Sequence, residues 1–335
     1  MLALALLALA ASAVLSALIT RISRPLLQRY ALARPNARSS HRIPTPQGAG
    51  IAVIAATLAV ASTWAVWANT AIPPILVGAT LFIALVGFAD DIRPLPVVVR
   101  LVLQAASIGA VVFAAPDDLR IFANWPLGLE RALLLFAGLW FVNLVNFMDG
   151  LDLMTVSEVV PITAAMLLLG WIGELSLPAT LVATTLCGAM IGFAPFNRPV
   201  AKVFLGDVGS LPIGLLLGWC LLHLAWHQHL AAALLLPAYY LADATVTLFR
   251  RVARREPFWA AHRTHFYQRA TDHGFGVERV VSEVFTLNLL LAALALLTIA
   301  ANSTVVTVLA GLSGAGAVVF LLQRFARKRA APKQR

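Results

Sequence analysis

The sequence contains five aspartates that lie beside asparagines and glycines in three separate stretches. They are Asp90, Asp91, Asp149, Asp152 and Asp207. Mg²⁺ needs only one or two protein oxygens and keeps its remaining positions for water and phosphate. Each aspartate alone could simply end a helix. Five of them in such surroundings favour a shared site for a cation and a phosphate group.

The stretch Asn143-Leu-Val-Asn146-Phe-Met-Asp149-Gly150 has a polar side chain at every third position. Residues at this spacing lie along one stripe of a helix. Gly150 then lets the chain turn directly after Asp149. Interhelical hydrogen bonding explains Asn143, whereas the adjoining carboxylates favour a stripe that faces a polar cleft.

A second polar stretch, 197–210, combines Asn197, Lys202 and Phe204 with a glycine-flanked Asp207. The flanking glycines allow the backbone to approach a ligand closely. A carboxylate at such a position suits a cation that also holds phosphate. Lys202 adds positive charge for an anionic substrate.

The third group is His262-Arg263-Thr-His265, which two aromatic residues follow. Two histidines and an arginine beside aromatic rings could grip a phosphate or a base. A zinc site is the alternative, but no third soft ligand lies near in the sequence. The arginines of 250–255 are typical of a surface that attracts anionic lipid.

Composition decides what kind of protein positions these side chains. Hydrophobic residues make up 60% of the 335 residues, charged residues make up 12%, and the mean hydropathy is +0.86. In ordinary globular proteins roughly 45–50% of residues are apolar and about 25% are charged. A soluble fold could not cover its surface with as few charged residues as this chain has. A soluble enzyme, a disordered chain and a disulfide-framed secreted domain are therefore excluded. Both cysteines lie in apolar runs and are expected to be packing residues.

Eleven apolar stretches have about the length that a helix needs to cross roughly 30 Å of hydrocarbon. They are 2–19, 49–68, 72–89, 96–115, 130–147, 153–173, 177–196, 208–226, 230–249, 281–300 and 303–322. The sequence therefore predicts an all-α, polytopic integral membrane protein. We expect one domain over 1–335, with a basic cytoplasmic tail at 323–335.

The basic residues predict the orientation in the membrane. If the spans alternate, 23 of the 25 Lys and Arg fall on one side, and only Arg120 and Arg131 fall on the other. By the positive-inside rule the richer side is cytoplasmic, so the N-terminus is outside and the C-terminus inside. The net charge of +10 is then explained by basic residues on the cytoplasmic side of the membrane, and no nucleic-acid partner is predicted. All five aspartates face the cytoplasm.

Several other polar residues are not assigned to this site. Asp117 and Asp118 fall in an outside loop and are expected to be solvated. Asp243 is expected to be an internally paired acid that helps shape the cleft. Those with no predicted role are Glu158, Glu174 and the outer histidines His223, His227 and His229, for which a metal site is the less favoured interpretation.

The four motifs occur in an order that resembles a known family. Asp90-Asp91, the Asn-x-x-Asn-x-x-Asp-Gly-x-Asp run at 143–152, the Phe-x-Gly-Asp-x-Gly-Ser run at 204–210 and the histidine cluster are similar to those of the polyprenyl-phosphate N-acetylhexosamine-1-phosphate transferases, glycosyltransferase family 4. The resemblance covers about 40–280. Within the family, 35–50 and 261–269 look closest to the branch that initiates O-antigen synthesis.

The resemblance implies transfer of a sugar 1-phosphate from a UDP-N-acetylhexosamine to undecaprenyl or another polyprenyl phosphate, with release of UMP. It implies that Asn146 and Asp207 hold magnesium, with manganese as the alternative ion. Asp90 and Asp91 would deprotonate or position the lipid phosphate, and Asp149 would support the metal and the diphosphate. The implied substrate contacts are Asp152, Asn197 and Phe204 at the uridine, and His262, Arg263 and His265 at the diphosphate or sugar.

Two departures from the family pattern bear on the substrate. The cell-wall branch has three adjacent histidines where this chain has His-Arg-Thr-His, which argues against a muramoyl-pentapeptide substrate. Leu153 follows Asp152 where glycine is usual, which leaves the geometry on the uridine side open. The resemblance further implies a bacterial inner-membrane enzyme for O-antigen or another envelope glycan. A second copy of the chain is a candidate partner.

A polytopic transporter or a flippase for lipid-linked sugars is the alternative function, because it would also use acids at membrane depth. Such a protein is expected to have broken helices and polar groups near mid-bilayer that serve both sides. The carboxylates here gather on one face instead. A non-catalytic polyprenyl-binding protein would not need the full set of acids.

Overall fold

The computed structural model describes residues 2–33, 44–257 and 262–328. Residues 35–43 of the segment that resembles the O-antigen branch therefore lie outside the described residues, as do residue 261 and 329–335 of the basic tail. Within the described residues the chain is almost entirely helical, and its two short strands form one antiparallel pair. The predicted all-α class is confirmed.

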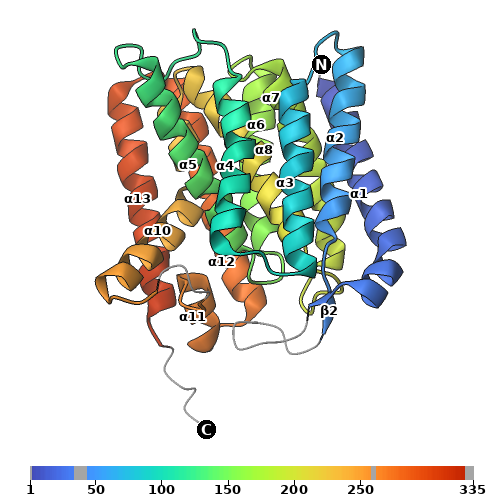
Figure 1. Ribbon diagram of the computed structural model, residues 1–335. Helices are drawn as coiled ribbons and strands as arrows, with labels where there is room; N and C mark the ends of the chain where they lie inside the picture. The colour runs from blue at the N-terminus through green and yellow to red at the C-terminus, as the bar shows by residue number, and fades with distance from the viewer. Residues whose placement is uncertain (1, 34–43, 258–261, 329–335) are drawn as a thin grey trace.

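Most helices of the described residues run along one common direction, with β2 and α11 at one end of the bundle (Figure 1). The helices are α1 (Leu2–Tyr30), α2 (Gly50–Trp67), α3 (Pro74–Ile92), α4 (Val97–Phe113), α5 (Leu127–Met148), α6 (Met154–Trp171), α7 (Leu177–Phe193), α8 (Asp207–Trp226), α9 (Leu230–Leu235), α10 (Ala238–Ala253), α11 (Phe266–Asp272), α12 (Val277–Ala301) and α13 (Thr304–Ala326), with a short 3-10 turn at Ala194–Phe196. The strands are β1 (Leu32–Ala33) and β2 (Thr45–Pro46).

Nine helices in the described part of the chain are long and apolar enough to cross a membrane. They are α1, α2, α3, α5, α6, α7, α8, α12 and α13, whereas α4 is apolar but has only 17 residues. The helices α4 and α5 begin directly after Pro96 and Pro126, where the missing proline N–H costs the helix nothing. The chain is therefore a multi-pass membrane protein, with fewer long spans than the eleven predicted.

The predicted span 230–249 is not one continuous helix, and this corrects the sequence analysis. Helix α9 ends at Leu235 and α10 begins at Ala238. Pro237 lies between them, and proline has no N–H for the helical ladder and clashes with the preceding turn. Asp243 of α10 accepts a hydrogen bond from the backbone N–H of Phe266, so α9 and α10 together still return the chain to the end of the bundle that carries α11.

Helix α8 packs against α2, α3, α5 and α7 and is the most buried of the long helices. Its start is held very close to two neighbours by glycines. A Cβ on Gly87 of α3 would lie 2.3 Å from the carbonyl oxygen of Asp207, and one on Gly50 of α2 would lie 2.2 Å from the Cα of Gly209. Only glycine fits at either position, and this close approach brings the end of α3 next to Asp207.

Candidate active site

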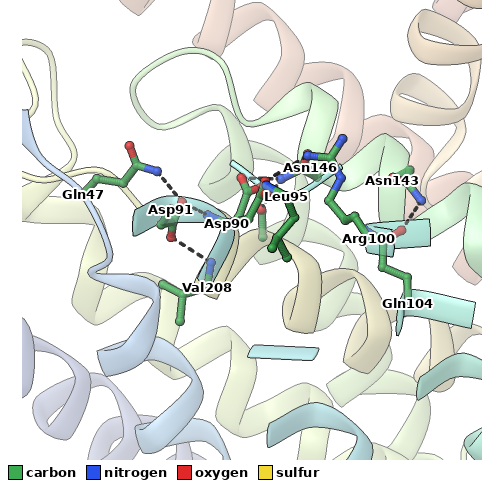
Figure 2. Close-up of polar contacts among 11 residues, drawn as sticks. Gln47, Asp90, Asp91, Leu95, Arg100, Gln104, Asn143, Asn146 and Val208 are labelled. Atoms are coloured by element: carbon green, nitrogen blue, oxygen red, sulfur yellow. Dashed lines mark hydrogen bonds and ion pairs between the residues drawn. The ribbon is translucent and has the colours of Figure 1, made fainter. Parts of the chain in front are cut away.

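The start of α8 is capped by a carboxylate from α3. Asp91 accepts hydrogen bonds from the backbone N–H groups of Asp207, at 2.9 Å, and Val208, at 3.1 Å. The side-chain amide of Gln47 donates to the same carboxylate (Figure 2). The first N–H groups of a helix have no partner inside it, and the helix dipole favours a negative charge there. Asp91 therefore fixes the start of α8 and, with it, the position of Asp207.

Asn146 and Asp207 are in direct contact between the end of α5 and the start of α8. Asn146 Nδ2 donates to Asp207 Oδ1 at 2.7 Å and to Ser210 Oγ at 2.9 Å. The two residues predicted as metal ligands are thus brought together. Because Asn146 donates through its nitrogen, its carbonyl oxygen stays available to a cation.

Asp90 lies close to Asp207 as well and also has partners toward α4. It accepts hydrogen bonds from Arg100 Nη1 at 2.9 Å and from the backbone N–H of Leu95 at 2.7 Å (Figure 2). Arg100 therefore neutralises Asp90. Within the described residues, no ion pair with a basic side chain neutralises Asp91 or Asp207.

This donor set fits a hard divalent cation. The carboxylates of Asp91 and Asp207 are close enough to repel each other, and the carbonyl oxygen of Asn146 adds a neutral ligand. In the described parts of the chain, no three or more His, Cys, Asp or Glu residues converge as a closed metal cage would require. Mg²⁺ does not need such a cage, because it keeps several positions for water and phosphate.

Asp149 lies just after α5, beside a threonine of α6. The hydroxyl of Thr155 donates a hydrogen bond to Asp149 Oδ1. Burial raises the pKa of the Asp149 carboxyl to about 7; the Thr155 hydrogen bond opposes this rise, and the charges of Asp91 and Asp152 add to it. Asp149 therefore titrates near neutral pH, and a nearby cation would favour its charged form.

Asp152 and Asn197 join the loop before α6 to the loop before α8. Asp152 Oδ2 accepts a hydrogen bond from the backbone N–H of Ala201 at 2.9 Å. Asn197 accepts from the N–H of Leu153 at 2.7 Å and donates to the carbonyl of Val203 at 3.0 Å. These two residues, predicted to contact the uridine, thus also hold the backbone around the predicted uridine side.

Leu153 adopts the left-handed conformation, with φ 62° and ψ 4°. This is the region that glycine occupies without steric cost and that other residues rarely adopt. The position at which the chain departs from the family pattern is therefore one where the backbone favours glycine. The turn itself is present, and Leu153 adopts its backbone conformation at a steric cost that glycine would not have.

Phe204 lies where the loop after β2 meets the loop before α8. Its backbone N–H donates to the carbonyl of Pro46 at 2.8 Å, and its carbonyl accepts from Ala49 at 3.0 Å. Gln47 pairs with Phe204 as an isolated parallel bridge. Because Gln47 also contacts Asp91, the Phe204 loop adjoins the carboxylates at the start of α8.

A buried carboxylate organises the histidine cluster. Asp243 is fully buried and accepts hydrogen bonds from His265 Nδ1 at 3.2 Å and from the N–H groups of Phe266 at 3.0 Å and Tyr267 at 3.1 Å. The same carboxylate accepts from the hydroxyls of Tyr239 at 3.2 Å and Thr247 at 3.3 Å. Asp243 thus caps α11 and orients the ring of His265, in agreement with the expected internally paired acid.

The histidine cluster contacts the end of α5. The rings of His262 and His265 stack at 4.9 Å between centroids, and Tyr267 donates its hydroxyl to the carbonyl of Phe147 at 2.9 Å. Burial lowers the pKa of His262 to about 4, and the charges of His265 and Arg251 act in the same direction. His262 is therefore neutral at physiological pH and serves as a hydrogen-bonding rather than a cationic group.

Two polar residues singled out from the sequence have other partners, and a third is exposed. Arg263 forms an ion pair with Asp272 at 3.1 Å within the α11 segment. Asn143 donates to Gln104 of α4 at 2.7 Å, as interhelical hydrogen bonding predicts (Figure 2). The side chain of Lys202 is exposed on the loop before α8.

Most of the residues set aside in the sequence analysis lie at the opposite end of the bundle, whereas Asp243 anchors the histidine cluster and Glu158 is buried in α6, where it accepts a hydrogen bond from Asn288. Asp117 and Asp118 are exposed in the loop between α4 and α5. His229 pairs with Glu174 at 2.8 Å, and His223 bonds Ser176 at 3.0 Å. These are pairwise contacts among loops and helix ends, with no metal cluster among the described residues.

Sequence analysis assigned no individual role to three uncharged residues of this region: Gln47, Thr155 and Tyr267. Each supplies one hydrogen bond to a site carboxylate or to the end of α5. Uncharged groups carry no large cost at membrane depth, so nothing in the sequence marks them as unusual. The available signal was proximity to a motif, since Tyr267 lies two residues after His265 and Gln47 precedes a glycine-rich turn.

The fold and the site together define a multi-pass helical membrane protein with a carboxylate and amide cluster at one end of the bundle. Comparison with known proteins shows which family this chain is similar to. The family model described as Glycosyl transferase family 4 matches residues 73–225. That range contains the aspartates of α3, the end of α5 and the start of α8.

Individual relatives support the same assignment. A probable undecaprenyl-phosphate N-acetylglucosaminyl 1-phosphate transferase of Bacillus subtilis is 27% identical over 283 residues, covering 78% of this chain and 76% of the relative. A phospho-N-acetylmuramoyl-pentapeptide-transferase of Streptococcus pneumoniae is 33% identical, covering 55% and 60%. A decaprenyl-phosphate N-acetylglucosaminephosphotransferase of Mycolicibacterium smegmatis is 31% identical, covering 56% and 52%. These matches confirm the resemblance to glycosyl transferase family 4 that was drawn from the motifs.

Proposed function

We propose that this protein transfers an N-acetylhexosamine 1-phosphate from a UDP-sugar to polyprenyl phosphate and releases UMP. The observation that carries the proposal is the contact between Asn146 and Asp207 at a helix start that Asp91 caps. It gathers oxygen ligands for a cation at one end of a membrane-embedded bundle. The Bacillus and Mycolicibacterium relatives, named as N-acetylglucosamine phosphate transferases of polyprenyl phosphates, support the reaction class.

In the proposed reaction, an oxygen of the lipid phosphate attacks the phosphorus that carries the sugar. The bond between that phosphorus and the oxygen bridging to the nucleotide phosphate breaks, and UMP leaves with the electron pair. Such transfers depend mainly on positioning and on neutralising charge at the phosphate oxygens. A magnesium ion held by Asn146 and Asp207 would supply that neutralisation when bound.

The remaining residues would position the two substrates. A phosphate monoester has a second pKa near 6, so the lipid phosphate is largely ionised at neutral pH and needs little help from a base. Asp91 would then act chiefly by fixing Asp207, and Asp90 with Arg100 would border the acceptor. Asp149 would support the cation and the diphosphate. The proposed uridine contacts are Asp152, Asn197 and Phe204, and those at the diphosphate or sugar are Lys202, His262, Arg263 and His265.

The sugar is proposed to be an N-acetylhexosamine rather than a muramoyl pentapeptide. The His-Arg-Thr-His sequence carries this choice, because it replaces the three adjacent histidines expected of the cell-wall branch. UDP-GlcNAc, UDP-GalNAc and a 6-deoxy sugar nucleotide such as UDP-N-acetylfucosamine are the candidate donors. The product would initiate O-antigen or a related glycan at the cytoplasmic face of a bacterial inner membrane.

The test is UMP release by purified membranes that contain the protein. Each candidate donor and the muramoyl-pentapeptide nucleotide are supplied with and without polyprenyl phosphate. We expect release only with the lipid and only with N-acetylhexosamine donors. Exclusive use of the muramoyl-pentapeptide nucleotide would contradict the substrate assignment. Substrate uptake into vesicles without the lipid would favour the transporter instead.

A further inference from the structure

A cationic pocket lies between the start of α12 and the end of α13, outside the candidate active site. It has a volume of about 440 Å³, and four basic residues line it: Arg279, Arg324, Arg327 and Lys328. Two phenylalanines, Phe275 and Phe320, line it as well. His273, just after α11, bonds the carbonyl of Phe325 at 2.9 Å, so the pocket lies at the same end of the bundle as the active site.

Part of this pocket is pre-ordered by an ion pair and by aromatic contacts. Glu283 accepts from Arg279 Nε at 3.0 Å and from Arg324 Nε at 2.7 Å. The guanidinium groups of the same two arginines lie 5.8 Å and 5.6 Å from the centre of the Phe275 ring. Two of the four cations are therefore held in place by the protein before any ligand arrives.

The charges of this pocket are not balanced. Glu283 is the carboxylate that pairs with these residues, and it serves Arg279 and Arg324 together. Among the described residues, neither Arg327 nor Lys328 has an ion pair. Four cations against one carboxylate leave a net positive pocket, which suits a phosphate-bearing anion.

The apolar side of the pocket lies on the outer surface of the bundle, where α13 is exposed. Phe320 is 66% exposed on α13, a helix apolar enough to cross a membrane. Leu312, nearer the start of the same helix, is also 66% exposed. A ligand with an anionic head and an apolar tail could therefore place its head among the arginines and its tail along α13. A soluble phosphate would use only the first of these surfaces.

We propose that this pocket binds the phosphate headgroup of an anionic membrane phospholipid. Basic pockets between membrane helices are suited to such headgroups, because each nearby cation strengthens the attraction. The site is distinct from the carboxylate cluster and does not depend on the proposed transferase reaction. Its occupancy can therefore be measured without any assay of activity.

The test compares three full-length proteins purified in detergent by native mass spectrometry. They are the wild type, the pocket variant Arg327→Gln/Lys328→Gln, and the control variant Arg254→Gln/Arg255→Gln, which removes two adjacent cations beyond α10. Phosphatidylglycerol is titrated as the anionic lipid, phosphatidylcholine as the neutral one, and glycerol phosphate as a soluble competitor. Thermal melting of all three proteins verifies that folding is unchanged.

We expect the pocket variant to bind phosphatidylglycerol more weakly, by about fivefold for each cation removed. The control variant should bind it as the wild type does, and all three should bind phosphatidylcholine equally. Unchanged binding by the pocket variant would overturn the proposal. Equal weakening in both variants would show diffuse surface attraction instead, and displacement of the lipid by glycerol phosphate would show a soluble-phosphate site.

Discussion

Asp243 and His265 share a hydrogen bond of 3.2 Å between the carboxylate and Nδ1, and this bond joins α10 to the residue just before α11. A carboxylate at Nδ1 sets the ring orientation and leaves Nε2 as the nitrogen that can meet another partner. The same carboxylate caps α11. One buried acid thus fixes both the segment that carries the histidines and the direction of one ring.

We expect Asp243→Asn to lower the rate of UMP release by about 10- to 100-fold, as loss of a supporting hydrogen-bond partner commonly does. Asparagine keeps the shape but turns one acceptor into a donor, so it cannot satisfy the N–H groups of α11 and His265 together. The measurement is kcat and KM for the UDP-sugar. The matched control, Thr247→Val, removes a single 3.3 Å contact to the same carboxylate and should have a small effect. Full activity of Asp243→Asn would mean that His265 does not need this anchor.

Asp207→Asn should lower magnesium-dependent UMP release by a factor on the order of a thousand or more, because it removes a charge beside the proposed cation without changing shape. The protein should still insert, since the substitution removes the cost of an ionised group near the membrane. Asp118→Asn, in an exposed loop at the other end, should be silent. If Asp207→Asn retained activity with unchanged magnesium dependence, Asp207 would not belong to the site.

Activity is expected to depend on pH through Asp149. Its pKa is raised to about 7, so the carboxylate is charged above that pH, and activity that needs the charge is lost as the pH falls through it. Thr155→Val removes a hydrogen bond that lowers this pKa. The acid limb of the pH–rate profile should therefore move upward by about one unit. Thr163→Val is the control and should leave the profile in place, because the hydroxyl of this buried threonine of α6 donates to the backbone carbonyls of Val159 and Val160.

The left-handed backbone at Leu153 predicts an unusual order of stabilities. Leu153→Gly should be at least as stable as the wild type, because glycine relieves a conformational cost of about 1–2 kcal/mol. Leu153→Val should be less stable than either, since a β-branched side chain tolerates this conformation poorly. Thermal melting in detergent gives the order. Equal melting temperatures for the glycine and valine variants would show that the turn is not strained.

The orientation of the bundle remains a prediction from the 23-to-2 distribution of basic residues. A reporter fused after Arg335 should read as cytoplasmic, and one inserted beside Asp117 should read as external. Both reporters on the same side would contradict the topology. The break at Pro237 does not change this expectation, because α9 and α10 together still cross to the end that carries α11.

The sequence by itself determined the class of protein and the stretches that matter. A chain with so few charged residues can be solvated only by a bilayer, and its long apolar runs predict most of the helices. Both properties depend on local composition. The same local reasoning found the family motifs. It wrongly predicted one continuous helix over 230–249, because it counted hydrophobic residues and did not consider that Pro237 interrupts a helix.

Only the tertiary structure decided which of these residues meet. Asn146 and Asp207 are 61 residues apart, and Asp91 and the N–H of Asp207 are 116 apart. Their contacts require the ends of α3 and α5 and the start of α8 to lie at one level, and they require Gly87 to admit the backbone of Asp207. It also revealed that Asp91 is a helix cap, that Asp90 is neutralised by Arg100, and that Asp243 anchors His265. The spacing of a motif indicates on which face of its own helix a residue lies. Its hydrogen-bond partners on other helices depend on how closely those helices can pack.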